Sequence, residues 1–145
     1  MTAFLLDVNV LIALIWPSHS AGARAQQWFQ RRSEEGWATS PFTEAGFLRV
    51  VANPRFSPDA LTAMQAVELL NDNLKHPGHQ FWPDEISYEE AVRPLAGRLS
   101  GHQQVTDAYL LGLAIHKGGK LATLDRSIAA LLPDNHLVRE HLELI

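Results

Sequence analysis

The chain has 145 residues, of which 46% are hydrophobic and 19% are charged. This composition allows one compact domain over residues 1–145 with a substantial core, and it excludes a disordered chain. Twelve Lys and Arg residues against sixteen Asp and Glu residues give a net charge of -4. That balance argues against broad, non-specific affinity for nucleic acid, although a local basic rim can still contact phosphates.

Cysteine is absent from the chain, which excludes disulfides, thiolate metal sites and cysteine nucleophiles and fits a reducing compartment. The longest apolar run, Val10 to Trp16, is too short to span a bilayer. No basic segment precedes it in the manner of a secretory leader. We therefore expect a cytoplasmic protein that has no contact with a membrane.

Short apolar runs alternate with helical patterns in the first part of the chain. Residues 3–6 predict a buried strand, and Asp7 is placed to cap a helix that continues to Pro17. A second helix is predicted over residues 20–32, and a second strand over residues 37–39.

The middle of the chain has clear start and stop signals for helices. Ser40 and Pro41 predict an N-cap followed by proline at the first helical position, and Asn53-Pro54 ends that helix. Residues 57–59 predict the start of a helix that runs to about Leu74. A weak strand is predicted over residues 80–82 after a loop rich in proline and glycine.

The last third repeats the alternation of helix and strand. Ser87 predicts the start of a helix, and a more apolar helix is predicted from Thr106-Asp107 to Ile115. Gly118-Gly119 closes that helix, and residues 120–124 predict a strand that leads directly to Asp125. We expect a short final strand or sheet edge at about residues 137–138.

This alternation predicts an α/β fold with a short, mostly parallel sheet. Four acidic residues interrupt otherwise apolar segments where a strand passes into a helix: Asp7, Glu44, Asp107 and Asp125. Because ligands of parallel sheets collect outside the carboxyl ends of the strands, we expect the four side chains to meet in one pocket. Four carboxylates in one place repel one another until a cation neutralises them, so the pattern indicates a divalent-metal site.

The four acidic segments, in this order and in a chain of this length, resemble those of the PIN-domain nucleases, in particular the toxins of VapBC toxin–antitoxin modules. The segments are LLDVNVL at residues 5–11, SPFTEAGFLR at 40–49, QVTDAYLL at 104–111 and ATLD at 122–125. The resemblance implies an α/β/α three-layer nuclease that uses Mg²⁺ or Mn²⁺ and cleaves RNA. It also implies a cognate antitoxin as partner, with a homodimer or a toxin–antitoxin hetero-oligomer as the assembly.

Oxygen ligands favour hard cations such as Mg²⁺ or Mn²⁺ over zinc, and a metal-bound water is a ready nucleophile for phosphodiester hydrolysis. We assign Asp7, Asp107 and Asp125 to metal binding, and Glu44 to metal binding or to orienting the attacking water. All four are the predicted catalytic residues. Each aspartate by itself has a simpler interpretation as a helix N-cap.

Four further side chains are candidates for supporting the ligands or for contacting substrate: Asn9, Thr106, Thr123 and Arg126. Thr123 shares a strand face with Asp125, since side chains on a strand alternate between the two faces. Arg126 is the best candidate for a phosphate contact, because guanidinium matches phosphate geometry. A cap, a satisfied backbone group or a solvated surface residue would explain these residues equally simply.

Two other functions remain open on the sequence. The chain could be a catalytically inactive PIN-like module that binds RNA or protein, although four intact carboxylates argue against this. An Asp-dependent phosphatase is disfavoured because Asn9, and not a second aspartate, stands two positions after Asp7. The seven histidines are scattered, and only His76 and His79 are close in sequence, so a zinc site is not expected.

Overall fold

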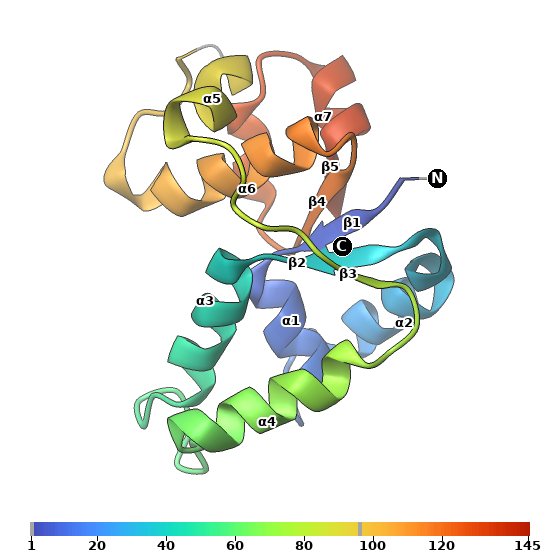
Figure 1. Cartoon of the computed structure of the whole chain (residues 1–145), viewed down its shortest axis with the longest axis vertical. Helices are drawn as coiled ribbons and strands as arrows, with labels where there is room; N and C mark the ends of the chain where they lie inside the picture. The colour runs from blue at the N-terminus through green and yellow to red at the C-terminus, as the bar shows by residue number, and fades with distance from the viewer. Residues whose placement is uncertain (1, 96) are drawn as a thin grey trace.

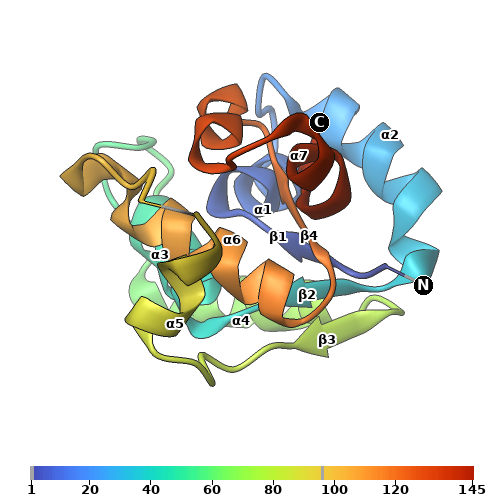
Figure 2. The same cartoon turned by 90° about the horizontal axis from the view of Figure 1, so that it is seen from above.

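The computed structural model describes residues 2–95 and 97–145. Within these residues, five strands form one sheet in the order β3-β2-β1-β4-β5, and all neighbouring strands are parallel (Figures 1 and 2). The strands are β1 (Phe4–Leu6), β2 (Trp37–Thr39), β3 (His79–Phe81), β4 (Lys120–Thr123) and β5 (Leu142–Leu144). The predicted parallel α/β fold is confirmed.

Helices cover both faces of the sheet, which gives three layers (Figure 1). One face carries the helices that connect β1 to β2 and β2 to β3, namely α1 (Val8–Ile15), α2 (Gly22–Arg32), α3 (Pro41–Val51) and α4 (Ala63–Leu74). The other face carries the helices that follow β3 and β4, namely α5 (Tyr88–Val92), α6 (Val105–His116) and α7 (Asn135–His141). Short 3₁₀ helices lie between these elements, including one at Arg126–Leu131 directly after β4.

The strands are short and apolar because both of their faces are buried. Leu5 and Leu121 pack into the core under α5, α6 and α7. Phe4, Leu6 and Ala122 point to the opposite face and pack into the core under α1 to α4. This alternation along β1 and β4 produces two hydrophobic cores, one on each side of the sheet.

Three of the predicted helix starts are confirmed by their caps. Asp7 is the N-cap of α1, and its side chain accepts a hydrogen bond from the backbone N–H of Val8. Ser40 caps α3, with proline at the first helical position as predicted. Ser87 caps α5. Each of these caps has an extended backbone. Its side chain accepts a hydrogen bond from an N–H group that has no partner within the helix.

Two predictions about element positions were wrong. The helix predicted from residues 57–59 begins later, at Ala63, because Thr62 and Gln65 form a reciprocal capping box there. The final strand predicted at residues 137–138 is helical and belongs to α7, because Asp134 caps a helix at that point. The strand follows as β5, and the other predicted elements differ from the structure by one or two residues at their ends.

The order of the strands determines where a ligand can bind. From β1 the chain moves to β2 and β3 on one side of the sheet, and it later places β4 and β5 on the other side. The carboxyl ends of β1 and β4 therefore lie side by side where the direction of winding reverses, which is the usual ligand position in such sheets. No helix among the described residues is both long enough and apolar enough to cross a membrane.

Candidate active site

Three of the four predicted acidic residues lie together at the carboxyl ends of the two central strands. Asp7 directly follows β1, Asp125 follows β4 after one intervening residue, and Asp107 lies in the first turn of α6. The pKa of Asp107 is raised to about 6, first by burial and then by the negative charges of Asp7 and Asp125. The three carboxylates are thus close enough to repel one another.

Thr123, the last residue of β4, forms hydrogen bonds with two of these aspartates. Its fully buried hydroxyl donates a hydrogen bond of 2.8 Å to Oδ2 of Asp7 and accepts one of 3.0 Å from the backbone N–H of Asp125. One hydroxyl group therefore ties the end of β1 to the end of β4. This position is a consequence of strand pairing, since Leu6 of β1 lies beside Ala122 of β4.

Asn9 completes the same network from the first turn of α1. Its amide group lies 3.3 Å from Oδ2 of Asp7 and 3.2 Å from the hydroxyl of Thr123, and it donates to both. Its carbonyl oxygen accepts a hydrogen bond of 3.1 Å from the backbone N–H of Leu124. Asn9 therefore holds α1 against the end of β4 and orients the carboxylate of Asp7.

The N-cap interpretation explains two aspartates and leaves the third unexplained. Asp7 caps α1, and Asp125 caps the following 3₁₀ helix by accepting from the N–H and hydroxyl groups of Ser127. Asp107 caps nothing, because α6 begins after Gln104. Among the described residues, no side chain or backbone group donates a hydrogen bond to the Asp107 carboxylate.

Asp7 is the most buried of the three, with 6% of its surface exposed. Burial raises the pKa of Asp7, hydrogen bonds from Thr123 and Val8 act in the opposite direction, and the charge of Asp125 adds to the rise. A carboxylate in this position is held in place by donors and yet remains electrostatically unfavourable. A bound cation would stabilise its charged form.

Glu44 has a different set of contacts from the three aspartates. It lies in the first turn of α3, half-buried, and its Oε2 accepts a hydrogen bond of 3.0 Å from the hydroxyl of Thr39. The Thr39 hydroxyl is also 2.8 Å from Nε2 of His79. Thr39 and His79 were not predicted, because only the pairing of β2 with β3 brings the three side chains together.

Two predicted residues are not part of the network. Thr106 and Arg126 are both exposed, and within the described residues their side chains form no hydrogen bond and no ion pair. Thr106 directly precedes Asp107, and Arg126 directly follows Asp125, so both lie next to acidic residues of the cluster in the chain. Their roles remain predictions.

The donor set fits a hard divalent cation. Its atoms are all oxygens, and the Asp107 carboxylate is half-buried, lacks a hydrogen-bond donor among the described residues and faces two further negative charges. Within residues 2–95 and 97–145, no three Asp, Glu or His side chains are grouped closely enough to bind one ion by themselves. Mg²⁺ typically takes one or two carboxylates directly and keeps several waters, so its ligands need not be three side chains.

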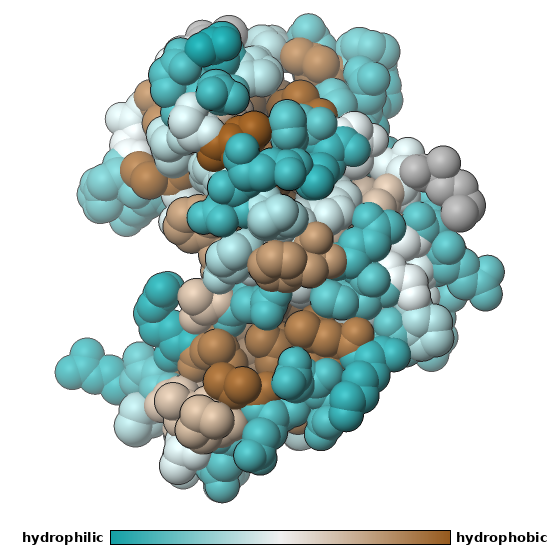
Figure 3. Space-filling view, in the orientation of Figure 1, coloured by the Kyte–Doolittle hydropathy of each residue, from teal (hydrophilic) through white to brown (hydrophobic). Residues whose placement is uncertain are grey.

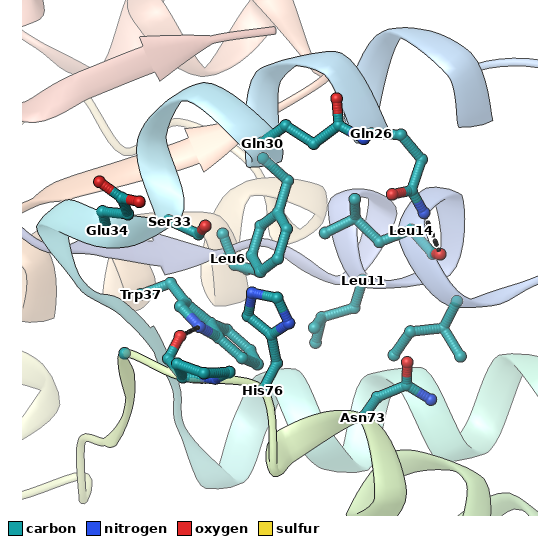
Figure 4. Close-up of a pocket in the computed structure, with 14 residues that line it drawn as sticks. Leu6, Leu11, Leu14, Gln26, Gln30, Ser33, Glu34, Trp37, Asn73 and His76 are labelled. Carbon is teal, nitrogen blue, oxygen red and sulfur yellow. Dashed lines mark hydrogen bonds between the residues drawn. The ribbon is translucent and has the colours of Figure 1, made fainter.

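A cavity lined by other residues lies away from the acidic cluster. It has a volume of about 740 Å³ and is lined by α1, α2, β2 and the segment that joins α4 to β3 (Figure 4). Leu11, Leu14 and Phe29 give it a mostly apolar wall. We call this cavity the apolar groove. In Figure 3, hydrophobic surface is visible on the same side of the molecule, above α4.

The model of the PIN domain family matches residues 4–131 of the chain. That match includes all four predicted acidic residues and all of the sheet except β5. The chain therefore belongs to the PIN-domain family, as the acidic segments predicted.

Three ribonucleases of Mycobacterium tuberculosis are similar to the chain along most of its length. The chain is 43% identical to Ribonuclease VapC39 over 129 residues, which cover 89% of this chain and 92% of the relative. It is 43% identical to Ribonuclease VapC38 over 127 residues, with 88% of each chain covered. It is 40% identical to Ribonuclease VapC44 over 125 residues, with 86% and 87% covered.

Solved structures support the fold. The structure of VapBC2 from Rickettsia felis bound to a promoter DNA fragment has a TM-score of 0.69 at 14% identity, with 99% of each chain covered. FitAcB from Neisseria gonorrhoeae has a TM-score of 0.62 at 18% identity, with 97% of this chain and 96% of that chain covered. The shared architecture extends along nearly the whole chain.

Proposed function

We propose that this chain is a metal-dependent endoribonuclease that acts as the toxin of a toxin–antitoxin pair. The observation that carries the proposal is the cluster of Asp7, Asp107 and Asp125, in which Asp107 is half-buried, repelled by its neighbours and, among the described residues, without a donor. The relatives at 40–43% identity are named as VapC ribonucleases, which supports RNA as the substrate class.

Asp7, Asp107 and Asp125 would hold a Mg²⁺ or Mn²⁺ ion. When bound there, the ion would lower the pKa of a water and neutralise charge on the phosphate under attack. Asn9 and Thr123 keep the carboxylate of Asp7 fixed through its Oδ2. Glu44 would bind the ion or orient the attacking water.

Arg126 and Thr106 would contact the RNA backbone at the edge of the cluster. Arg126 is exposed, follows Asp125 directly and, within the described residues, makes no ion pair that would hold it elsewhere. Its guanidinium can bind a phosphate with two parallel hydrogen bonds. The exposed hydroxyl of Thr106 offers a weaker polar contact next to Asp107.

An inactive PIN-like binding module is the alternative. A pure scaffold gains nothing from three adjacent carboxylates, and the repulsion at Asp107 would only destabilise it. The phosphatase interpretation is weaker still, since the side chain two positions after Asp7 is the amide of Asn9, which is used to hold Asp7 and Leu124.

Cleavage of single-stranded RNA by the purified chain tests the proposal. We expect cleavage with Mg²⁺ or Mn²⁺ and no cleavage with EDTA. The rate of cleavage should fall at least about 100-fold in Asp107→Asn. Asp134→Asn is the matched control, because Asp134 caps α7 and asparagine is an equally good cap. Equal activity of the Asp107→Asn variant and the wild type would contradict the assignment.

A cognate antitoxin is the proposed partner, in keeping with the VapBC and FitAcB structures that share the fold. We propose that an apolar segment of the antitoxin lies in the apolar groove, because this groove has a volume of about 740 Å³ and a mostly hydrophobic wall. A basic or amide side chain of the antitoxin would enter the acidic cluster and take the place of the cation.

The assembly, a homodimer or a toxin–antitoxin hetero-oligomer, would act in the cytoplasm, where its RNA substrate is found.

Two matched substitutions on α2 test the groove. Gln30 lines it and Gln27 does not, and both side chains are exposed. Gln30→Trp should obstruct the groove and weaken binding of the antitoxin encoded beside the chain, while Gln27→Trp should bind normally. Both variants should retain metal-dependent cleavage. Equal antitoxin affinity of the two variants would exclude the groove as the binding site.

A further inference from the structure

A chain of two hydrogen bonds connects Glu44 to the edge strand of the sheet. Oε2 of Glu44 accepts a bond of 3.0 Å from the hydroxyl of Thr39, and that hydroxyl is 2.8 Å from Nε2 of His79. Thr39 is the last residue of β2 and is completely buried, and His79 is the first residue of β3. Three elements, α3, β2 and β3, are therefore linked through side chains alone.

The number of protons fixes the direction of both hydrogen bonds. A threonine hydroxyl has one proton, and an ionised carboxylate can only accept. Since Thr39 donates its proton to Glu44, its oxygen must accept the bond from His79, and the ring must carry a proton on Nε2. Burial lowers the pKa of His79, so the ring is neutral near pH 7 and its other nitrogen is unprotonated.

Packing holds the histidine ring in place. The ring of His79 lies against the indole of Trp37, with centroids 4.7 Å apart and an angle of 52° between the planes. Trp37 is nearly completely buried, and its indole N–H donates a bond of 3.1 Å to the backbone carbonyl of Pro77. The donor that reaches Thr39 therefore comes from a rigid part of the fold.

We propose that His79, acting through Thr39, is a positioning residue that fixes Glu44 for hydrolysis. The histidine N–H holds the threonine hydroxyl in the rotation that directs its only proton to Oε2 of Glu44. Oε1 has no donor among the described residues, which leaves it available for the attacking water. Without the histidine, the hydroxyl could turn away and the glutamate would lose its tether. This inference rests on the nuclease function proposed above.

The test uses pairs of substitutions that remove or retain each hydrogen bond. Thr39→Val keeps the shape and removes the hydroxyl, and Thr39→Ser retains the hydroxyl. His79→Leu removes the donor, and His79→Gln supplies an amide N–H in its place. We expect Thr39→Val and His79→Leu to lower kcat about tenfold with little change in KM, the loss that one hydrogen bond to a charged group represents. Thr39→Ser and His79→Gln should retain most of the activity.

A double-mutant comparison separates positioning from a general loss of structure. If His79 acts only through Glu44, His79→Leu should have no further effect on kcat in a Glu44→Gln background. The combination of Thr39→Val with His79→Leu should be no worse than either change alone. Independent, multiplied losses in both comparisons would overturn the proposal, and so would full activity of Thr39→Val and His79→Leu.

NMR of the ring nitrogens tests the hydrogen-bond chain even if the wild type proves inactive. Lack of RNA cleavage by the wild type would contradict the proposed nuclease function. In that case we still expect the Nε2-protonated form of His79 in the wild type, and its loss or exchange broadening in Thr39→Val. A wild-type ring protonated on Nδ1 alone would overturn the assignment of His79 as the donor, whether or not the protein cleaves RNA.

Discussion

Asp107 differs from the two other aspartates of the cluster because no hydrogen-bond donor among the described residues satisfies it. Asp7 and Asp125 each cap a helix, so their presence in the sequence could be explained without a ligand. Asp107 is half-buried, and its raised pKa reflects that burial and the charges of both neighbours. A bound cation would relieve this repulsion. In the absence of a cation, removal of the Asp107 charge should therefore stabilise the fold, whereas loss of a structural residue would destabilise it.

In metal-free buffer, Asp107→Asn should increase the free energy of unfolding at pH 7 to 8. The folded-state pKa of about 6 lies above the ordinary value of 3.8, so the folded protein binds the proton more tightly than the unfolded chain. Asp107 therefore makes the wild type lose stability as pH rises from about 4 through about 6, and the variant should lack this contribution. Because Asp107 is only half-buried, we expect a gain on the order of 1 kcal/mol, measured by urea unfolding in EDTA.

The same measurement at pH 4 provides the control. There the Asp107 carboxyl of the wild type is protonated in the folded state and resembles the amide, so the two proteins should have nearly equal stability. A destabilised Asp107→Asn at pH 7 to 8 would indicate a structural role that the observed contacts do not show.

Thr123→Val should destabilise the fold by about 1–3 kcal/mol, because the change leaves buried partners without their hydrogen bonds. The partners are Oδ2 of Asp7 and the backbone N–H of Asp125. Thr123→Ser retains the hydroxyl and should cost about 1 kcal/mol or less, the value of one buried methyl group. Thermal or urea unfolding of the two variants measures the difference, and equal stability would show that the network contributes little.

The residues of the candidate active site could be predicted to different extents. Asp7 and Asp125 follow apolar strands, and Asp107 follows a helix start, so local patterns in the sequence were sufficient to group them. Thr39 and His79 could not be found in this way. Their contact depends on β3 lying beside β2 in a register that places Trp37 next to His79, and that is a property of the folded sheet.

At the scale of secondary structure, α6 can lie close to α5 because residue 112 is glycine. A methyl group at this position would overlap the backbone carbonyl of Ala91, and backbone cannot move aside as a flexible side chain can. We expect Gly112→Ala to destabilise the protein by about 1–3 kcal/mol, because overpacking outweighs the gain of about 1 kcal/mol in helix propensity. Since α6 carries Asp107, RNA cleavage should also fall.

Gly101→Ala is the control for the glycine substitution. Gly101 has φ −150°, which any residue adopts, and nothing lies within 4 Å of a methyl group there. The free energy of unfolding of Gly101→Ala should stay within about 0.5 kcal/mol of that of the wild type. A Gly112→Ala variant as stable as Gly101→Ala would show that the two helices adjust more easily than their contact indicates.

Helix caps explain which element boundaries were predictable. Ser40 followed by proline, and Ser87 before a helical pattern, were recognised correctly from the sequence. Thr62 and Asp134 cap helices as well, and both were missed. Near Thr62 the earlier Ser57-Pro58-Asp59 offered a competing start signal, and near Asp134 the helix is short and its apolar residues fit a strand equally well.

At the scale of the whole molecule, the sheet brings together residues from both ends of the chain. Asp7 follows the first strand and Asp125 follows the fourth, and they meet because β1 and β4 are neighbours (Figure 2). The network of Asn9, Thr123 and Asp7 therefore exists only in the folded protein. A cation bound by this cluster should stabilise the fold as a whole, since the unfolded chain lacks the site.

Mn²⁺ should raise the midpoint of thermal unfolding of the wild type and leave Asp107→Asn nearly unchanged. At a free concentration 100 times the dissociation constant, the expected stabilisation is about 2.7 kcal/mol. Calorimetry with and without EDTA measures it, and Asp134→Asn should respond to the ion as the wild type does. An equal response of Asp107→Asn and the wild type would show that the ion binds elsewhere.

The acidic cluster should drive hydrolysis of RNA through a metal-activated water. End-group analysis of a cleaved oligonucleotide, with Mn²⁺ and with EDTA, tests this mechanism most directly. We predict a 5′-phosphate and a 3′-hydroxyl, formed only with the metal, because water and not the ribose 2′-hydroxyl is the nucleophile. Cleavage that persists in EDTA, or products with a 2′,3′-cyclic phosphate, would contradict the mechanism.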